Sequence, residues 1–150
     1  MREYIKTNSE HPDFLAMNTA LDAELHIRDG AEHAFYSQYN KIDKIKHVII
    51  AMDEGKPVGC GALKPYADDV VEIKRMFVRE PHRGQGIASY VLSALEEWAK
   101  DLNYGKCILE TGVNQPEAIA LYHKSKYTVI PNYGQYLNAA NSVCFEKKLG

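Results

Sequence analysis

The chain has 150 residues, of which 45% are hydrophobic and 25% charged, and 18 basic against 20 acidic side chains give a formal net charge of −2. These fractions are ordinary for a globular protein and exclude a disordered or fibrous one. The length predicts one domain spanning residues 1–150, and the near-neutral charge disfavours nucleic acid as a partner, since that requires a basic surface.

The first half of the chain predicts two helices and four strands. Residues 13–27 predict a helix, because Phe14, Met17, Leu21 and Leu25 form one apolar stripe, and Gly30 is a suitable helix end. A shorter helix is predicted over residues 32–39. Strands are predicted over residues 2–6, 47–52, 57–63 and 70–78. The last three strands are joined by a turn at 53–56 and a loop at 64–69, so we expect them to pair antiparallel.

The second half predicts a loop at 79–86 that leads into an amphipathic helix at 87–102. A further helix is predicted at 116–125, with Pro116 in its first turn. The remaining strands are predicted over residues 106–110, 127–130 and 142–149. Together these elements predict an α/β (α+β) domain with a central mixed, mostly antiparallel sheet flanked by helices.

No segment predicts export or a membrane span. The N-terminus is polar, and the longest apolar run, residues 48–52, is far shorter than the roughly 20 residues of a transmembrane helix. The three cysteines, Cys60, Cys107 and Cys144, are far apart, which disfavours a disulfide framework. We therefore expect a cytoplasmic protein without a membrane partner. The scattered histidines form no metal-binding motif, so we predict no metal site.

The loop at 79–86 is the strongest candidate for a binding site. Gly84 and Gly86 allow a ligand to approach the backbone, and the free N–H groups of the following helix favour an anion such as phosphate. Arg79, His82 and Arg83 add side-chain donors. A tight turn without a ligand is the alternative. A dinucleotide-binding turn is disfavoured because Ser89 stands in place of the third glycine, and no Walker lysine follows.

Two motifs resemble one known family. Residues 83–88, RGQGIA, match the R/Q-x-x-G-x-G/A signature of the GNAT acetyltransferase superfamily, and residues 118–124, AIALYHK, resemble its A-x-x-L-Y-x-K helix. The order of the predicted elements also agrees, so the resemblance covers almost the whole chain. It implies an acyltransferase with acetyl-CoA as the co-substrate.

The resemblance also implies the residues that bind acetyl-CoA. The loop amides would hold the pyrophosphate, and the backbone of residues 76–78 would pair with the pantetheine arm. Gln115 stands where the family usually has asparagine, with Asn114 beside it, and Lys126 replaces the glycine that usually permits a left-handed helix end. The implied set is Met76, Phe77, Val78, Arg83, Gly84, Gln85, Gly86, Ile87, Ala88, Ser89, Asn114, Gln115, Tyr122 and Lys124.

Three side chains are the catalytic candidates. Tyr122 matches the family's tyrosine near the thioester sulfur and would donate a proton to the leaving thiolate. Glu72 or Glu110 would accept the amine proton, although water alone is a further option. With regular alternation, Glu72 shares a strand face with Lys74, Met76 and Val78. The alternatives are a tyrosine bonded to a backbone carbonyl, and glutamates paired with Lys74 or Arg75.

The resemblance therefore implies an N-acetyltransferase that moves an acetyl group from acetyl-CoA directly to an amine of a small molecule, amino acid or peptide. A non-catalytic acyl-CoA-binding sensor or interaction module is the alternative. We expect the acceptor pocket to be built from residues 13–39 and 133–141, with the aromatic segment at 131–136 bordering it. The sequence does not determine the oligomeric state, and a homodimer is one option.

Overall fold

One seven-stranded sheet organises the residues that the structure describes, which are 2–29 and 44–150 of a computed structural model. The elements in chain order are β1 (Arg2–Thr7), α1 (Pro12–Asp29), β2 (His47–Asp53), β3 (Lys56–Ala67), β4 (Val70–Val78), the 3-10 helix η2 (Glu80–His82), α3 (Ile87–Asp101), β5 (Lys106–Gly112), α4 (Pro116–Lys124), β6 (Thr128–Ile130), the 3-10 helix η3 (Gly134–Tyr136) and β7 (Ser142–Lys148). The strand order is β1-β2-β3-β4-β5-β7-β6. Of these described neighbours, β4 and β5 run parallel and the others antiparallel, which confirms the predicted mixed sheet.

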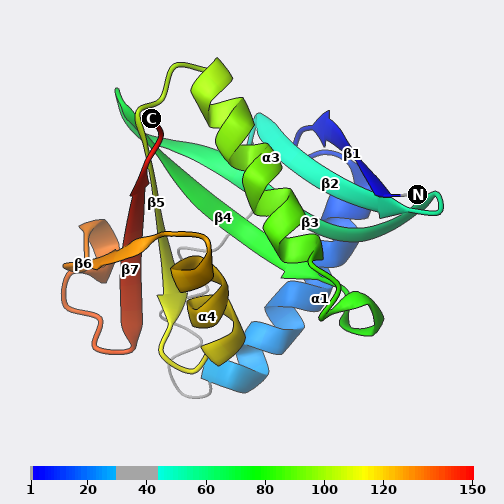
Figure 1. Cartoon of the computed structure of the whole chain (residues 1–150). Helices are drawn as coiled ribbons and strands as arrows, with labels where there is room; N and C mark the ends of the chain where they lie inside the picture. Colours follow the sequence, from blue (N-terminus) through cyan, green and yellow to red (C-terminus); the bar gives the residue numbers. More distant parts are fainter. Residues whose placement is uncertain (1, 30–43) are drawn as a thin grey trace.

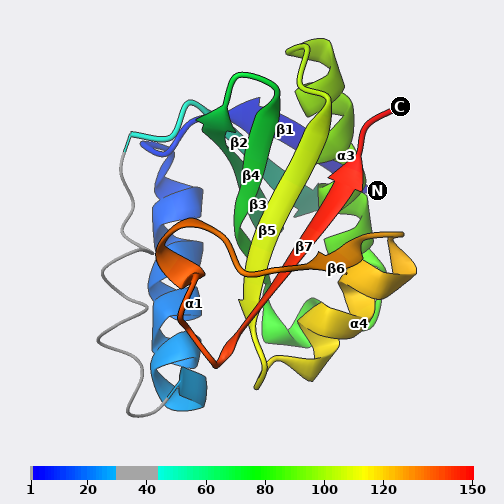
Figure 2. The same cartoon turned by 90° about the vertical axis from the view of Figure 1, so that its left-hand side faces the viewer.

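Helices cover both faces of the sheet. Figure 1 shows α3 and α4 on one face, and Figure 2 shows α1 on the other. Each face has its own buried apolar cluster, with Leu95 and Ile49 on the α3 side and Phe14 and Met17 on the α1 side. Burying a large apolar side chain is worth about 1.5–3 kcal/mol, so these clusters hold the helices to the sheet. The predicted α/β (α+β) class is confirmed.

β3 is longer than the sequence predicts. Residues 64–67, predicted as part of a loop, continue the strand to Ala67 and pair with the start of β4. The prediction of a loop is wrong for these residues. β2 pairs with β3 only as far as Leu63, so residues 64–67 of β3 have β4 on one side and no strand on the other. Proline is tolerated on such an open edge, so Pro65 does not end the strand.

The other described α-helices and strands agree with the predicted ranges to within two residues at each end, and the 3-10 helices η2 and η3 lie in segments predicted as loops. The predicted helix over residues 32–39 and the helix end at Gly30 lie outside the described residues. Of the described helices, none combines the length and apolar character needed to cross a bilayer.

β4 carries a bulge in its middle. The pairing between β3 and β4 passes over Gly61 on one strand and over both Arg75 and Met76 on the other. Arg75 has a positive φ of 60°, which is uncommon for a residue with a side chain. Two residues therefore oppose one at this point, and such a bulge re-aims the side chains around it.

Because of the bulge, one prediction about which residues share a face of β4 is partly wrong. Glu72, Lys74 and Arg75 all lie on the α1 face, where they contact α1 or the segment at 131–136. Met76 and Val78 instead pack against the α3-side cluster. The expectation that Glu72 shares a strand face with Lys74 is confirmed. The expectation that Met76 and Val78 share that face is wrong, because it assumed regular alternation and the bulge interrupts the alternation after Lys74.

α4 ends in a left-handed residue that is not glycine. Lys126 has φ of 71°, and its N–H donates to the His123 carbonyl at 3.1 Å while the Tyr127 N–H donates to the Tyr122 carbonyl at 2.9 Å. This pair of hydrogen bonds is a Schellman helix end. The lysine therefore does not remove the left-handed end, contrary to expectation, but it adopts a backbone conformation that favours glycine.

Replacing Lys126 with glycine is expected to stabilise the fold by about 1 kcal/mol, since a left-handed backbone costs a residue with a Cβ about 1–2 kcal/mol and glycine's greater unfolded entropy offsets part of that. The melting temperature should rise by about 2–4 °C for a chain of this size. Thermal unfolding measures the change. Lys126→Ala is the control, because it removes the charge and keeps the strain. An equal rise in both variants would contradict the backbone explanation.

Candidate active site

The glycine loop and the start of α3 form a surface with the geometry that suits an anion, called the anion-binding surface below. Gly84 and Gly86 have positive φ of 78° and 79°, and a Cβ built on Gly84 meets nothing within 4 Å. Gly86 is the N-cap of α3 and provides no side-chain cap, and the first helical bond runs from the Tyr90 N–H to the Gly86 carbonyl. The amides of residues 87–89 therefore have no partner within the helix, and the helix dipole adds about half a positive charge there.

Arg2 joins this loop from β1, which sequence reasoning missed. Its Nη2 donates to the Gln85 carbonyl at 2.8 Å, and its guanidinium lies over the Tyr90 ring at 5.7 Å. The two partners of that hydrogen bond are 83 positions apart in the chain, so no local motif could indicate it. The contact adds a positive charge to the anion-binding surface.

A cavity of about 650 Å³ begins at this surface and lies between diverging strands. β4 and β5 pair only over residues 70–72 and 106–108, and beyond these residues they separate (Figure 1). The cavity wall contains residues of α3 and α4 from one face of the sheet and of α1 and η3 from the other. One cavity therefore connects the two faces.

Most of the predicted site residues line this cavity. Those in the wall are Glu72, Met76, Phe77, Val78, Arg83, Gly84, Gly86, Ile87, Ala88, Ser89, Glu110, Gln115, Tyr122 and Lys124. Gln85 and Asn114 are not in the wall. Of the two adjacent amides predicted for the pantetheine contact, the structure therefore brings only Gln115 to the cavity, where it is buried at the N-cap of α4.

The cavity side of β4 presents an open backbone edge. The Arg79 N–H donates to the Val58 carbonyl on β3 at 2.9 Å. Successive residues of a strand direct their backbone N–H and C=O groups to opposite edges. Because Arg79 faces β3, Val78 and Met76 face the opposite edge of β4, where β5 no longer pairs with it beyond Glu72. An extended ligand could add to this edge in the manner of a strand.

Arg83 spans the entrance between α1 and β4. Its Nε donates to the Val78 carbonyl at 2.8 Å, and its Nη2 donates to Glu24 of α1 at 2.6 Å. The Val78 carbonyl is thus already hydrogen-bonded by a protein side chain. The sequence placed Arg83 at the anion site, and the structure adds this link to the α1 face.

Tyr122 stands in the cavity wall with its phenol protonated. The side chain is 5% exposed, and its ring packs against those of Tyr127 and Phe145 at centroid distances of 5.8 and 5.7 Å. Burial raises the pKa of Tyr122, and the charge of Glu110 raises it further. Its hydroxyl makes no hydrogen bond to another described residue, so the alternative of a tyrosine bonded to a backbone carbonyl is not observed. The group can act as a proton donor.

Glu72 is a buried carboxylate held in one orientation. The Tyr133 hydroxyl donates to its Oε2 at 2.6 Å, and its Oε1 lies 3.9 Å from the Nζ of Lys74. Burial lowers the pKa of Lys74. The alternative role predicted for Glu72, an ion pair with Lys74, is therefore observed. Glu72 also lines the cavity, so the ion pair does not exclude it as a candidate base.

Glu110 approaches the cavity from β5. The Ser142 hydroxyl donates to its Oε2 at 2.7 Å. Glu110 pairs directly with Cys144, which packs with Tyr136, so its side chain lies on the same sheet face as Glu72. The two candidate bases therefore converge on one side of the cavity from two strands.

Sequence reasoning missed the hydroxyls that hold these carboxylates. Tyr133 lies 61 positions from Glu72, and Ser142 lies 32 positions from Glu110. The aromatic segment at 131–136 was the available signal, and Tyr136 from it does line the cavity.

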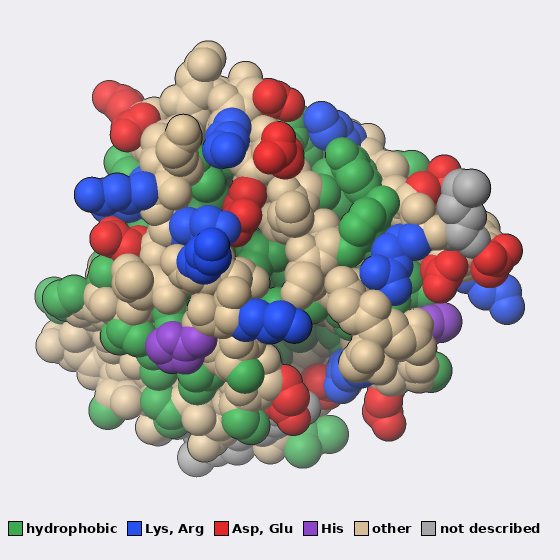
Figure 3. All heavy atoms as spheres, viewed as in Figure 1, with side chains coloured by type: hydrophobic (Ala, Val, Ile, Leu, Met, Phe, Trp, Pro, Cys, Tyr) green, Lys and Arg blue, Asp and Glu red, His purple; other side chains and the backbone are tan. Residues whose placement is uncertain are grey.

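A smaller basic groove lies beside α4. It is lined by Ser89, Leu92, Ser93, Glu96, Lys124, Ser125, Lys126 and Lys147. Ser89 and Lys124 also line the main cavity, so the two hollows adjoin. Figure 3 shows Lys and Arg side chains on this face, over α4 and the start of α3. Positive charge thus extends along the anion-binding end.

The three thiols are protonated at neutral pH. Burial raises the pKa of Cys144 to about 11 and the pKa of Cys60 and Cys107 to about 12. A thiolate is the nucleophilic form of cysteine, so these side chains are poor nucleophiles.

Comparisons with known proteins agree with this geometry. An IAA acetyltransferase of Azospirillum brasilense is 35% identical over 102 residues, which are 67% of this chain and 67% of that protein. In five further curated relatives the matched segment covers about a third to a half of the relative's own length.

Two solved structures resemble the whole chain. A provisionally assigned acyl-CoA N-acyltransferase of Klebsiella pneumoniae is 27% identical with a TM-score of 0.84, covering 100% of this chain and 99% of that one. A GNAT family acetyltransferase of Elizabethkingia anophelis, solved with acetyl-CoA bound, is 17% identical with a TM-score of 0.69 and shares the fold over 99% of this chain and 98% of its own.

The family assignment from the two sequence motifs is confirmed, and with it the enzyme class, an acyltransferase. The family profile matches residues 14–127, which include the glycine loop, β4, β5 and α4. The chain belongs to the Acetyltransferase (GNAT) family.

Proposed function

We propose that the protein transfers an acetyl group from acetyl-CoA directly to an amine of a small molecule, amino acid or peptide. The observation that carries this proposal is the cavity between β4 and β5, which joins the anion-binding start of α3 to Tyr122 and to two carboxylates. The bound acetyl-CoA of the Elizabethkingia neighbour supports acetyl-CoA as the donor. The free, buried cysteines support a reducing compartment, the cytoplasm.

The anion-binding end is proposed to hold the pyrophosphate of acetyl-CoA. The amides of residues 87–89 donate to it, and the open edge of β4 at Met76 and Val78 receives the pantetheine arm. Gln115 is also in the cavity wall, and its side-chain amide is proposed to contact the same arm. This arrangement directs the thioester toward Tyr122.

The chemistry needs one bond to form and one to break. The neutral amine nitrogen attacks the thioester carbonyl carbon, a C–N bond forms, and the C–S bond breaks. The amine proton passes to Glu72 or Glu110, and the thiolate takes a proton from the Tyr122 hydroxyl, which solvent then restores. Holding amine and thioester together supplies most of the rate, and a backbone N–H of β4 stabilises the charge on the carbonyl oxygen.

The alternative, a module that holds acyl-CoA without chemistry, shares the anion-binding end and differs in turnover. Thiol release from acetyl-CoA, measured over a panel of amines, separates the two. Saturable release with any amine supports the enzyme, and tight CoA binding without release across the panel supports the module. Absence of CoA binding would contradict both.

Replacing Tyr122 with phenylalanine is expected to lower kcat about tenfold while the KM for acetyl-CoA changes little. The phenol is buried and protonated, so it can donate to the leaving sulfur. A free thiol has a pKa of about 8.5, so the thiolate leaves tolerably well without that proton, which keeps the loss modest. Steady-state kinetics measure the two constants. A raised KM with an unchanged kcat would make Tyr122 a binding residue instead.

A further inference from the structure

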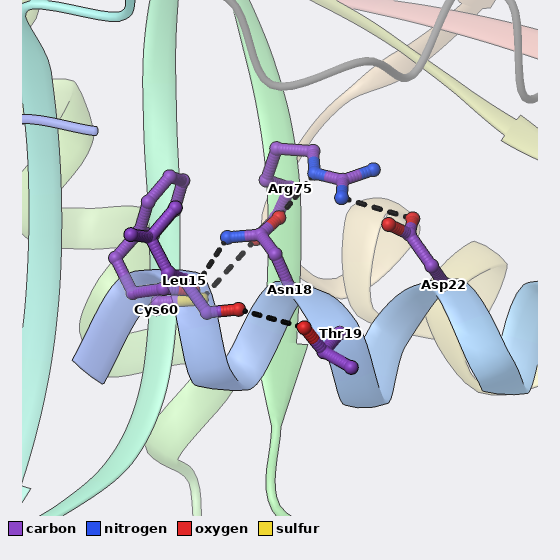
Figure 4. A network of polar contacts seen from close by, with 7 residues as sticks. Leu15, Asn18, Thr19, Asp22, Cys60 and Arg75 are labelled. Carbon is purple, nitrogen blue, oxygen red and sulfur yellow. Dashed lines mark hydrogen bonds and ion pairs between the residues drawn. The ribbon is translucent and has the colours of Figure 1, made fainter. Parts of the chain in front are cut away.

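A buried cation on the α1 face of the cavity has an unused donor. The Arg75 side chain is 2% exposed, and its guanidinium contacts Asn18 through Nε and Asp22 through Nη2, the latter at 2.9 Å. Its Nη1 is buried and has no hydrogen-bond partner among the described residues. Figure 4 shows this nitrogen directed away from α1.

Such a donor calls for an acceptor beyond the described residues, and a bound ligand can supply one. Buried polar groups in native proteins are nearly always hydrogen-bonded, and a charged N–H left without a partner is especially unfavourable. Arg75 is one of the residues of the cavity wall, so its unused donor lies next to the space that a ligand would fill. Asp22 does not complete the pairing, because it engages Nη2 and its own side chain is 51% exposed.

The bulge in β4 is what brings Arg75 to this position. Regular alternation would place Lys74 and Arg75 on opposite faces, but the bulge puts both cations on the α1 face. Arg75 adopts a positive φ to do so. Unfavourable backbone of this kind clusters at functional sites, where it aims a side chain.

The surroundings favour a carboxylate as the missing partner. A guanidinium binds planar anions through charge-assisted hydrogen bonds. The pyrophosphate is not the expected partner of Arg75, because its proposed site lies at the start of α3, on the other face of the sheet. Glu72 lies three positions earlier on the same strand and face, which is at most about 10 Å along β4. An anion that can hold a cationic amine and a cation that can hold a carboxylate therefore lie on the same face of β4, three residues apart along the strand.

We propose that the acceptor is a zwitterionic amine whose carboxylate binds the Nη1 of Arg75 while its amino group lies at Glu72. The inference rests on the proposed acetyl transfer and narrows the amines to those that carry a carboxylate. Arg75 is then the residue that determines acceptor specificity.

The test compares each amino acid with its own carboxamide. Thiol release is measured with the twenty common amino acids, β-alanine and γ-aminobutyrate, with their carboxamides, and with simple alkylamines. The wild type should favour at least one carboxylate over its amide by about thirtyfold or more in kcat/KM, the effect of losing one partner of a buried charge pair. In Arg75→Gln this preference should fall to within a few-fold, mainly through loss of activity on the carboxylate.

The ratio separates recognition from folding, because a merely structural loss would lower both substrates equally and leave the preference unchanged. Arg75→Lys is the second variant. It keeps a cation near Asp22 but lacks the third nitrogen, so it should lower the preference as well. Arg79→Gln is the control, since Arg79 donates to the Pro57 carbonyl and is not in the cavity wall, and it should keep the wild-type preference.

The failures are distinguishable. Turnover of amines without preference for carboxylates would overturn this inference and leave the acetyltransferase intact. A carboxylate preference that survives in Arg75→Gln and Arg75→Lys would overturn the role of Arg75. No turnover with any amine would overturn the proposed function and this inference with it.

Discussion

Replacing Gly86 with glutamate is expected to weaken acetyl-CoA binding about a thousandfold. Gly86 is the N-cap of α3, where the free amides converge and where the pyrophosphate is proposed to lie. Two like charges 4 Å apart near a protein surface repel by about 4 kcal/mol, which corresponds to about three powers of ten in affinity. Isothermal titration calorimetry with acetyl-CoA measures the loss.

Gly55→Glu is the matched control for this experiment. Gly55 has nearly the same positive φ, 76°, and a Cβ there meets nothing within 4 Å, but it lies in the turn between β2 and β3, outside the cavity wall. The control therefore introduces the same backbone strain and the same charge. Loss of affinity in both variants would point to folding, and wild-type affinity in Gly86→Glu would refute the pyrophosphate site.

Glu72→Gln is expected to lower kcat/KM by about a hundredfold or more, whereas Glu110→Gln should lower it about tenfold. Tyr133 fixes the Oε2 of Glu72, so its Oε1 is the oxygen left to accept the amine proton. General-base catalysis contributes about 10²–10⁴-fold, and glutamine keeps the hydrogen bond to Tyr133 while losing the basic oxygen. Steady-state kinetics with the best amine of the panel measure both losses.

Glu96→Gln is the control for the carboxylates. Glu96 also accepts a hydrogen bond from a tyrosine, Tyr127, at 2.9 Å, but it lies outside the main cavity wall. Its replacement tests the general effect of neutralising such a carboxylate and should leave kcat/KM close to the wild-type value. A larger loss in Glu110→Gln than in Glu72→Gln would make Glu110 the base, and wild-type activity in both would make water the base.

The sequence predicts well what local patterns encode. The glycines at 84 and 86 indicate a loop with positive φ, and the following apolar stripe indicates α3, so the anion-binding surface could be located before the structure. The motif around Tyr122 likewise put that residue in the cavity wall. In each case, residues close in the chain determine the geometry.

The acceptor side could not be predicted in the same way. The bulge at Arg75 arises from the pairing of β4 with β3, and alternation along β4 alone gave the wrong face for Met76 and Val78. The contacts of Tyr133 with Glu72 and of Arg75 with α1 join segments more than 50 positions apart. Only the folded sheet brings these side chains together.

The most direct test of the account follows both products of one reaction. With an amine that supports thiol release, free CoA is measured by its thiol and the N-acetylated amine by mass spectrometry, in wild type and in Gly86→Glu. Direct acetyl transfer at this cavity predicts one acetylated amine for each CoA released by the wild type, and neither product above background in Gly86→Glu. Release of CoA without an acetylated amine, or equal product formation by Gly86→Glu, would contradict direct acetyl transfer at this cavity.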